Sequence, residues 1–141
     1  EKAVWVSHRT DKERVVIGCD TIVVLDDKLL GKPVDEPDAL RILTTLSGRQ
    51  HTVCTGVALI RDQEVVASGY ELTKVFFNDV GSEQIRTYID SGEPMDKAGA
   101  YGIQGMGGFL VDRIEGQLDN VIGLPRLLLD ELAGRMLELQ R

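Results

Sequence analysis

The sequence predicts an α/β domain with a mixed, partly antiparallel, elongated sheet flanked by helices, arranged as two lobes around a cleft. Runs rich in β-branched residues alternate with helix-like segments, but without the strict repetition of parallel βαβ units. Two of the strand-like runs are joined by a short turn, which is typical of an antiparallel pair. The length of 141 residues suits one domain, residues 1–141, with a substantial core.

The strands are predicted from apolar, β-branched runs bounded by turn residues. The first covers residues 15–25, and after a turn at Asp26 and Asp27 a short arm at 28–30 pairs back onto it. Four further runs are predicted as strands, at residues 52–60, 64–77 with a bend at Gly69, 109–114 and 118–122.

The helices are predicted from apolar residues at intervals of three and four. The predicted helices are a helix tail at 1–10, a helix at 37–47 from Pro37 to a stop at Gly48, one at 82–91 capped by Ser82, and a last one beginning at Pro125. The last helix has a stripe of Leu128, Leu129, Leu132, Met136 and Leu139, which we expect to be buried.

Composition excludes several classes of protein. The net charge of -7 argues against nucleic-acid binding, which needs a basic face. No run approaches the roughly 20 apolar residues that span a bilayer, and no signal peptide is visible. Cys19 and Cys54 lie in strand-like runs, so we expect buried free thiols in a cytoplasmic protein. Two histidines without a Cys-x-x-Cys pair make a zinc site improbable.

Asp20 interrupts the first strand and is the first candidate site residue. An ionised carboxylate in an apolar run must lie at a strand end, pair with a cation or hold a metal. Lys32 follows shortly after and could serve an anionic substrate bound through a metal. The alternative is that Asp20 caps a turn and Lys32 is a solvated charge.

A second candidate stretch, residues 92–105, places two acids, a lysine, a tyrosine and a glutamine among four glycines. Glycines let a backbone approach a ligand closely, and the side chains could bind metal, phosphate and a base edge. A long surface loop has the same composition. His51 could act as a general base, but a structural hydrogen bond is the preferred interpretation. Asn120 precedes a helix start, where an anion or an ordinary cap would fit.

Together these stretches resemble the Maf-type nucleoside triphosphate pyrophosphatases. The matching segments are GCDT at 18–21, GKP at 31–33, LSGRQH at 46–51, TGV at 55–57, GEPMDKAGAYGIQG at 92–105 and NVIGLP at 120–125. Each is weak alone, but they occur together in family order, and the segment at 96–105 resembles the branch acting on dTTP and UTP. The resemblance implies the Maf and inosine-triphosphate-pyrophosphatase type of fold.

The resemblance also implies a reaction, in which water attacks the α-phosphorus and releases nucleoside monophosphate and pyrophosphate. Mg²⁺ or Mn²⁺ would be the cofactor. Asp20 would accept the proton and ligate the metal, while Lys32 and Lys97 would neutralise phosphate charge. Glu93 and Asp96 are candidates for a second carboxylate near the metal and for substrate binding. Thr21 and Gln104 resemble the positions that set base preference.

The chain departs from the family pattern in two places. Cys19 stands where a small residue such as Ala is more usual, and the family's opening strand, Ser- and Arg-rich loop and helix are not seen before Glu1. We therefore expect that the sequence begins inside a longer protein, that it lacks a phosphate-binding Arg, and that an exposed sheet edge favours self-association, a homodimer included.

Three functions follow from these observations. The first is a cytoplasmic pyrophosphatase acting on dTTP, UTP and modified pyrimidine triphosphates, with a housekeeping or division-restraining role. The second is a non-catalytic nucleotide-binding regulatory module. The third, an acidic protein-interaction domain, accounts for the charge but not for Asp20 or the stretch at 92–105.

Overall fold

The structure is a computed structural model that describes residues 1–139 and 141. A long antiparallel sheet forms its centre, and in the described part of the chain its five strands have the order β2-β1-β3-β4-β5. The strands are β1 (Val16–Leu25), β2 (Lys28–Leu30), β3 (Gln50–Arg61), β4 (Glu64–Phe77) and β5 (Val111–Glu115). The α-helices are α1 (Lys2–Ser7), α2 (Glu36–Leu46), α3 (Ser82–Asp90), α4 (Leu118–Ile122) and α5 (Arg126–Glu138), and three 3₁₀ turns lie at Glu93–Asp96, Ala98–Ala100 and Met106–Leu110.

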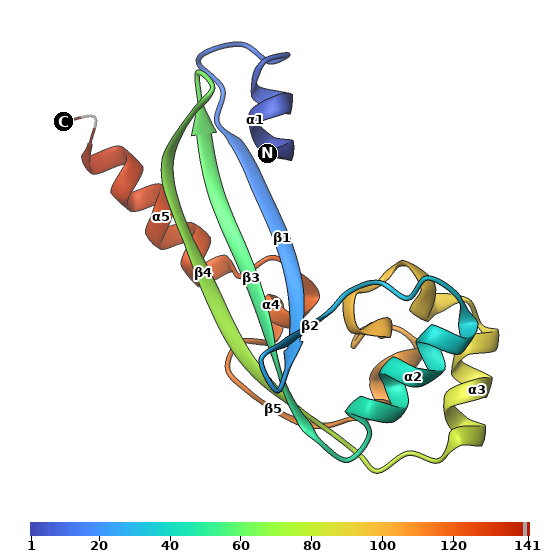
Figure 1. Cartoon of the computed structure of the whole chain (residues 1–141). Coiled ribbons are helices and arrows are strands. Elements are labelled where there is room, and N and C mark those ends of the chain that lie inside the picture. The colour runs from blue at the N-terminus through green and yellow to red at the C-terminus, as the bar shows by residue number, and fades with distance from the viewer. Residues whose placement is uncertain (140) are drawn as a thin grey trace.

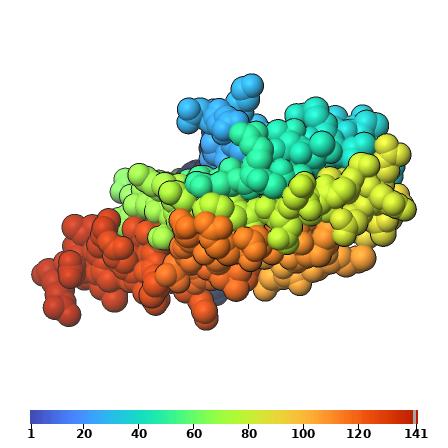
Figure 2. All heavy atoms as spheres, turned by 90° about the horizontal axis from the view of Figure 1, so that it is seen from below, coloured from blue at the N-terminus to red at the C-terminus, as the bar shows by residue number. Residues whose placement is uncertain are grey.

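The predicted fold class is confirmed, with one difference in the sheet. Every strand pair among the described residues is antiparallel, where a mixed sheet was predicted. The molecule is elongated: α2 and α3 lie at one end of the sheet, while α1 and the far end of α5 lie toward the other (Figure 1). Figure 2 shows the same separation from below, with the C-terminal residues at one end and those of α2 and α3 at the other.

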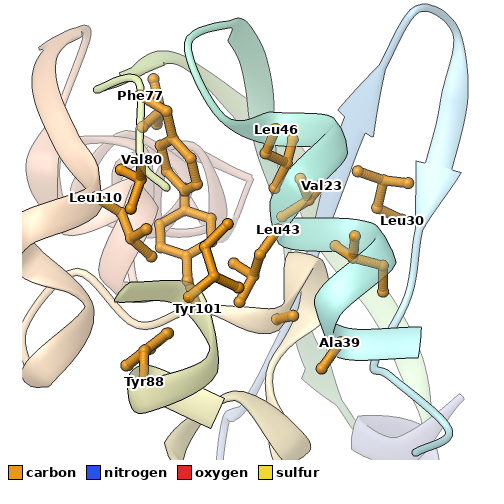
Figure 3. Packing of buried hydrophobic residues seen from close by; sticks show 14 of the residues in the cluster. Val23, Leu30, Ala39, Leu43, Leu46, Phe77, Val80, Tyr88, Tyr101 and Leu110 are labelled. Atoms are coloured by element: carbon orange, nitrogen blue, oxygen red, sulfur yellow. The ribbon is translucent and has the colours of Figure 1, made fainter. Parts of the chain in front are cut away.

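Each end of the molecule has its own hydrophobic cluster. The larger fills the space between α2, α3 and the sheet and includes Leu43 and Leu46 from α2 and the rings of Phe77 and Tyr101 (Figure 3). The smaller lies under α5, where Leu128 and Leu132 pack on Val57 and Leu59. Each cluster removes apolar area from water, so each end of the molecule has its own source of stability.

Turn residues close the sheet as the sequence predicts. Asp26 and Asp27 both have positive φ, which is the backbone of the tight turn that joins β1 to β2. Asp62 and Gln63 do the same between β3 and β4. At Gly69, the predicted bend, a Cβ would lie 3.0 Å from Leu128 Cδ1, so the absent side chain leaves room for α5.

Several local predictions were wrong. Residues 118–122 form helix α4 and not a strand, because a run this short has no readable period. The N-cap of α3 is Gly81 and not Ser82. Leu139 is 79% exposed, because it lies beyond the end of α5.

Other predictions held only in part. Pro37 falls one position later than predicted in α2, since Asp35 is the cap and accepts from Asp38 N at 2.8 Å. The cysteines are free thiols, but Cys19 is exposed and Cys54 is only half-buried. None of the helices in the described residues is long and apolar enough to cross a bilayer.

Candidate active site

A cleft of about 560 Å³ opens beside β1, facing the segment that follows α3. All seven residues predicted from the sequence as site residues line it: Asp20, Thr21, Lys32, Glu93, Asp96, Lys97 and Gln104. They come from three stretches that are distant along the chain. Fold and register therefore bring the predicted residues together.

Strand β1 forms one wall of the cleft. Asp20 lies opposite Gly56 of β3, and Thr21 lies opposite Thr55. On its other side β1 pairs with β2 only from Val23 onward, so the edge at Asp20 is open. Asp20 is exposed and makes no side-chain hydrogen bond or ion pair with any other described residue. Its carboxylate is thus free to take a proton or a cation.

The second wall is a loop that Glu93 holds in place. Glu93 Oε1 accepts from Tyr88 Oη at 2.8 Å and from Gly107 N at 3.1 Å, and Oε2 accepts from Met106 N at 2.9 Å. Desolvation alone would raise the pKa of Glu93, but these hydrogen bonds and the nearby Lys97 outweigh it and lower that pKa. Burial raises the pKa of Tyr88, so its hydroxyl stays protonated as a donor.

Glycines allow the loop to close on Glu93. A Cβ on Gly107 would lie 2.5 Å from both Gly102 O and Tyr88 Oη, and one on Gly105 would overlap the Glu93 carboxylate. A carboxylate that accepts several backbone N–H groups fixes those groups in one arrangement. Tyr88 supports the cleft through Glu93 but is not among the residues predicted from the sequence, because nothing beside it in the predicted helix at 82–91 indicates such a role.

Both lysines of the cleft interact electrostatically with the carboxylate of Asp96. Lys97 Nζ lies 2.8 Å from Asp96 Oδ1, and this hydrogen bond, with the charges of Lys97 and Lys32, lowers the pKa of Asp96. Lys32 and Lys97 thus both stabilise the charge of one carboxylate, although they are far apart in sequence and only Lys97 lies within ion-pairing distance of it. Arg49, a weaker candidate from the sequence, pairs instead with Asp26 at 2.5 Å, and it is not among the residues that line the cleft.

His51 lies on β3, outside the cleft lining, and is structural, as preferred from the sequence. It is 2% exposed, and its Nε2 lies 2.7 Å from Tyr101 Oη. The His51 ring meets Phe77 and Tyr101 edge to face. Burial lowers the pKa of His51 to about 4, so the ring is neutral at pH 7. A neutral, enclosed imidazole that does not line the cleft is not placed to act as a general base.

Asn120 does not bind an anion at a helix start, one of its two predicted roles. Its side chain is fully buried and its Nδ2 contacts Val53 O, Glu71 O and Thr73 Oγ1 at 3.0–3.2 Å. The neighbouring Asp119 caps α5 instead, because its Oδ2 accepts from Arg126 N at 3.1 Å. A carboxylate already occupies that helix start, which disfavours a second anion there.

The cleft combines charged groups with an aliphatic lining. Besides the seven polar residues, branched side chains line it: Val23, Val53, Ile103, Val121 and Ile122. Small-molecule sites have this mixture, in which apolar surface contacts the flat part of a ligand and a few polar groups orient it. The lining therefore suits a ligand with an apolar or aromatic part and an anionic part.

The acids of the cleft fit a metal that arrives with a substrate better than one held by the protein alone. Within the described residues, no group of three His, Cys, Asp or Glu side chains comes together as a metal site. Mg²⁺ is commonly bound through one or two carboxylates together with substrate phosphates. The acids of the cleft that could hold such a cation together with a substrate are Asp20, Glu93 and Asp96.

Comparison with known proteins gives one consistent result. The family profile described as Maf-like protein matches residues 1–136. A dTTP/UTP pyrophosphatase of Desulfitobacterium hafniense (strain Y51) is 54% identical over 121 residues, which are 86% of this chain and 54% of that protein. The dTTP/UTP pyrophosphatase of Thermoanaerobacter sp. (strain X514) is 49% identical over 125 residues, 88% of this chain and 65% of that protein.

A third relative, the dTTP/UTP pyrophosphatase of Clostridium perfringens (strain SM101 / Type A), is 50% identical over 125 residues, covering 88% of this chain and 65% of that protein. The chain thus spans between about half and two thirds of the length of these curated relatives. The family profile covers almost the whole chain, and its segments place their polar residues in one cleft. The chain belongs to the Maf-like protein family.

Proposed function

We propose that the protein hydrolyses nucleoside triphosphates, with dTTP and UTP as substrates, to the monophosphate and pyrophosphate. One observation carries the proposal: seven residues from three separate stretches, two lysines and three acids among them, line a single cleft. The relatives named dTTP/UTP pyrophosphatase support the choice of substrate.

Asp20 is the proton acceptor for the attacking water. Its carboxylate has no partner among the described residues, so a lone pair is available. A general base must lie within hydrogen-bonding reach of the proton it removes, and an exposed side chain at the open edge of β1 can meet that condition. The step forms the bond between water oxygen and α-phosphorus, moves one proton to Asp20, and breaks the bond to the leaving pyrophosphate.

Lys32 and Lys97 neutralise the phosphates. Both already act on the carboxylate of Asp96, so they lie where an anion would meet two cations. A bound triphosphate can replace Asp96 as the partner of Lys97, since their ion pair is partly exposed and therefore weak. Asp96 is then released and can help Asp20 hold a cation.

Mg²⁺ or Mn²⁺, held by Asp20 with Asp96 or Glu93, would supply Lewis-acid polarisation of the phosphoryl group. Thr21 and Gln104 select the base. The Gln104 amide offers donors and an acceptor that complement the O4 and N3 edge of uracil or thymine.

Compartment and oligomeric state stay predictions: a cytoplasmic protein that associates as a homodimer. Tyr70 and Leu72, side by side with Cys54 and Gly56 of β3, leave an exposed apolar area on β4 that fits self-association. Sedimentation over a range of protein concentrations decides this point.

The proposed function is tested by incubating the protein with Mg²⁺ and a panel of triphosphates while measuring pyrophosphate and monophosphate. We expect dTTP and UTP each to give pyrophosphate and monophosphate in equal amounts, and CTP to be turned over much more slowly. Release of inorganic phosphate alone would contradict attack at the α-phosphorus. Thermal protection by UTP without any product would indicate the non-catalytic binding module.

A further inference from the structure

A line of hydrogen bonds runs from Thr21, at the cleft, into the interior of the sheet. Thr21 Oγ1 lies 2.9 Å from Thr55 Oγ1, and Thr55 Oγ1 lies 3.0 Å from the carbonyl oxygen of Asn120. Thr55 and Asn120 are both 0% exposed, whereas Thr21 lines the cleft. A ligand can therefore contact Thr21, and the two residues behind it can act only through Thr21.

The direction of these bonds follows from counting protons. A threonine hydroxyl has one proton to donate, and a backbone carbonyl can only accept. If the Thr55 proton pointed at Thr21, the Thr55 and Asn120 oxygens would face each other at 3.0 Å without a proton between them. Two buried oxygens that face each other without a hydrogen bond cost free energy of folding. Thr55 therefore donates to Asn120, and Thr21 must donate to Thr55.

The end of the line is held in place. The Asn120 side chain is fixed by three acceptors on β3 and β4, and its carbonyl oxygen also accepts from Gly123 N at 3.1 Å. Thr73, one of those acceptors, donates its own proton to Gln117 O at 3.0 Å. The acceptor for Thr55 thus cannot turn away, and the arrangement exists before any ligand binds.

A consequence for recognition follows. Because the proton of Thr21 is used inside the protein, its hydroxyl presents only lone pairs to the cleft. The ligand group opposite must then be a donor. Uracil and thymine carry an N3–H donor between two carbonyl groups, whereas N3 of cytosine is an acceptor and would meet the Thr21 oxygen lone pair to lone pair.

We propose that Thr55 and Asn120 are positioning residues that fix the hydroxyl direction of Thr21, so that the cleft accepts a pyrimidine N3–H and rejects cytosine. This rests on the proposed function, since it concerns the base of the same substrate. This line of hydrogen bonds from Thr21 through Thr55 to Asn120 O, called the relay below, extends base selection to two buried residues that no ligand can touch.

Substitution of Thr55 tests the relay. Thr55→Val keeps the shape but removes the acceptor, so the Thr21 hydroxyl is free to donate into the cleft. We expect the ratio of kcat/KM for UTP over CTP to fall by about tenfold, the size of one ordinary hydrogen bond. Thr55→Ser keeps the hydroxyl and should keep the ratio. An unchanged ratio in Thr55→Val overturns the proposal.

Thr73→Val is the matched control. Thr73 is also a fully buried threonine and bonds the same Asn120 side chain, but it does not contact Thr21. We expect this variant to lose stability while it keeps the UTP to CTP ratio, because Val53 O and Glu71 O still hold the Asn120 side chain and Thr55 keeps its acceptor. If Thr73→Val lowered the ratio as much as Thr55→Val, general loosening of the sheet would explain the effect and the relay would be rejected.

A neutron diffraction map of the deuterated, nucleotide-free protein separates this inference from the proposed function. We expect the Thr55 deuterium to lie toward Asn120 O and the Thr21 deuterium toward Thr55. The reverse direction overturns the relay whatever the activity. If the deuterons lie as expected but UTP and dTTP are neither bound nor hydrolysed, the proposed function fails, and base selection by Thr21 fails with it.

Discussion

The two walls of the cleft are built by different means. On the β1 wall, Asp20 and Thr21 are positioned by cross-strand register with β3, so backbone pairing sets their places. On the loop wall, backbone N–H groups of Met106 and Gly107 are positioned by a side chain, the carboxylate of Glu93. One wall is therefore fixed by many cooperative bonds, and the other by a few bonds to one charged group.

This difference indicates how the site can be both rigid and adjustable. A strand paired over most of its length resists local change, while a loop of 3₁₀ turns held by one carboxylate can open when that group is lost. Reacting groups placed on the rigid wall keep their geometry, and groups that must admit and release a substrate suit the other wall. The following four predictions test this division, from the largest expected effect to the smallest.

Asp20→Asn removes the proton acceptor from the β1 wall without changing its size. We expect kcat to fall by about 10²–10⁴-fold, the usual range for loss of a general base. The fold should persist, because Asp20 is exposed and contributes no described side-chain bond. Turnover of UTP and a circular dichroism melt on the same preparation check this. A variant with near wild-type turnover would remove Asp20 from its role.

Acid should destabilise the packing of His51 against Phe77 and Tyr101. The pKa of His51 is about 4 in the folded state against an ordinary 6.5, so the unfolded chain binds the proton more readily. As the pH falls from 6.5 toward 4, stability is lost by up to roughly 3 kcal/mol, and the loss stops below the folded pKa.

Urea unfolding at a series of pH values measures this effect. His51→Gln, which keeps a polar partner for Tyr101 but does not titrate, is the matched variant. Its stability should be lower at pH 7 and should depend less on pH between 6.5 and 4. Parallel pH curves for the two proteins would show that His51 is not the group responsible.

Gly107→Ala and Gly56→Ala compare the loop wall with the strand that supports the β1 wall, since Gly56 of β3 lies opposite Asp20. The new Cβ on Gly107 would overlap Tyr88 Oη and Gly102 O, whereas nothing lies within 4 Å of a Cβ on Gly56. We expect Gly107→Ala to destabilise by about 1–3 kcal/mol. Gly56→Ala should be neutral or slightly stabilising, since Ala loses less entropy in a strand.

Thermal melts of both glycine variants give the stabilities, and the KM for UTP shows whether the loop wall has moved. We expect KM to rise in Gly107→Ala only. Equal losses of stability in the two variants would show that the loop wall is no more sensitive to an added methyl group than the sheet is at Gly56.

Gln104→Glu is expected to have the smallest effect. The change removes the two amide donors and adds a charge on the loop wall, while Asp20 is untouched. We expect the UTP to CTP ratio of kcat/KM to fall by about tenfold or less, with kcat for UTP nearly kept. Steady-state kinetics with both substrates measure it, and an unchanged ratio would mean that Gln104 contacts a different part of the ligand.

Sequence patterns predicted the strands and the cleft residues better than they predicted the connections. Residues 64–77 were predicted to the residue, because a long β-branched run between turn residues has one good interpretation. The run at 118–122 was misread, since five residues span little more than one helical turn and fit a strand equally well. Long, periodic segments carry their structure in the sequence, and short ones depend on their neighbours.

The site was predicted by residue type, but its supporting bonds were not. Asp20 stood out because a charge is unusual in an apolar run. Lys97 stood out because it lies with two acids in a glycine-rich stretch. Tyr88 gave no such signal, since it lies within an ordinary helical pattern, and Thr55 was marked only as part of the matching segment at 55–57, with no role attached. Their importance comes from what lies across the fold, the Glu93 carboxylate and the Thr21 hydroxyl, and no local pattern contains that information.

The long β3–β4 hairpin implies an order of folding. These strands pair across a tight turn at Asp62 and Gln63, so their contacts need little loop closure. β1 must wait for residues 26–49 to fold back, and the loop wall joins still later along the chain. We expect amide hydrogens of β3 to exchange slowest and those of residues 93–108 fastest. A nascent or partly unfolded chain would thus keep its hairpin while having no cleft, and catalytic competence would report completed folding.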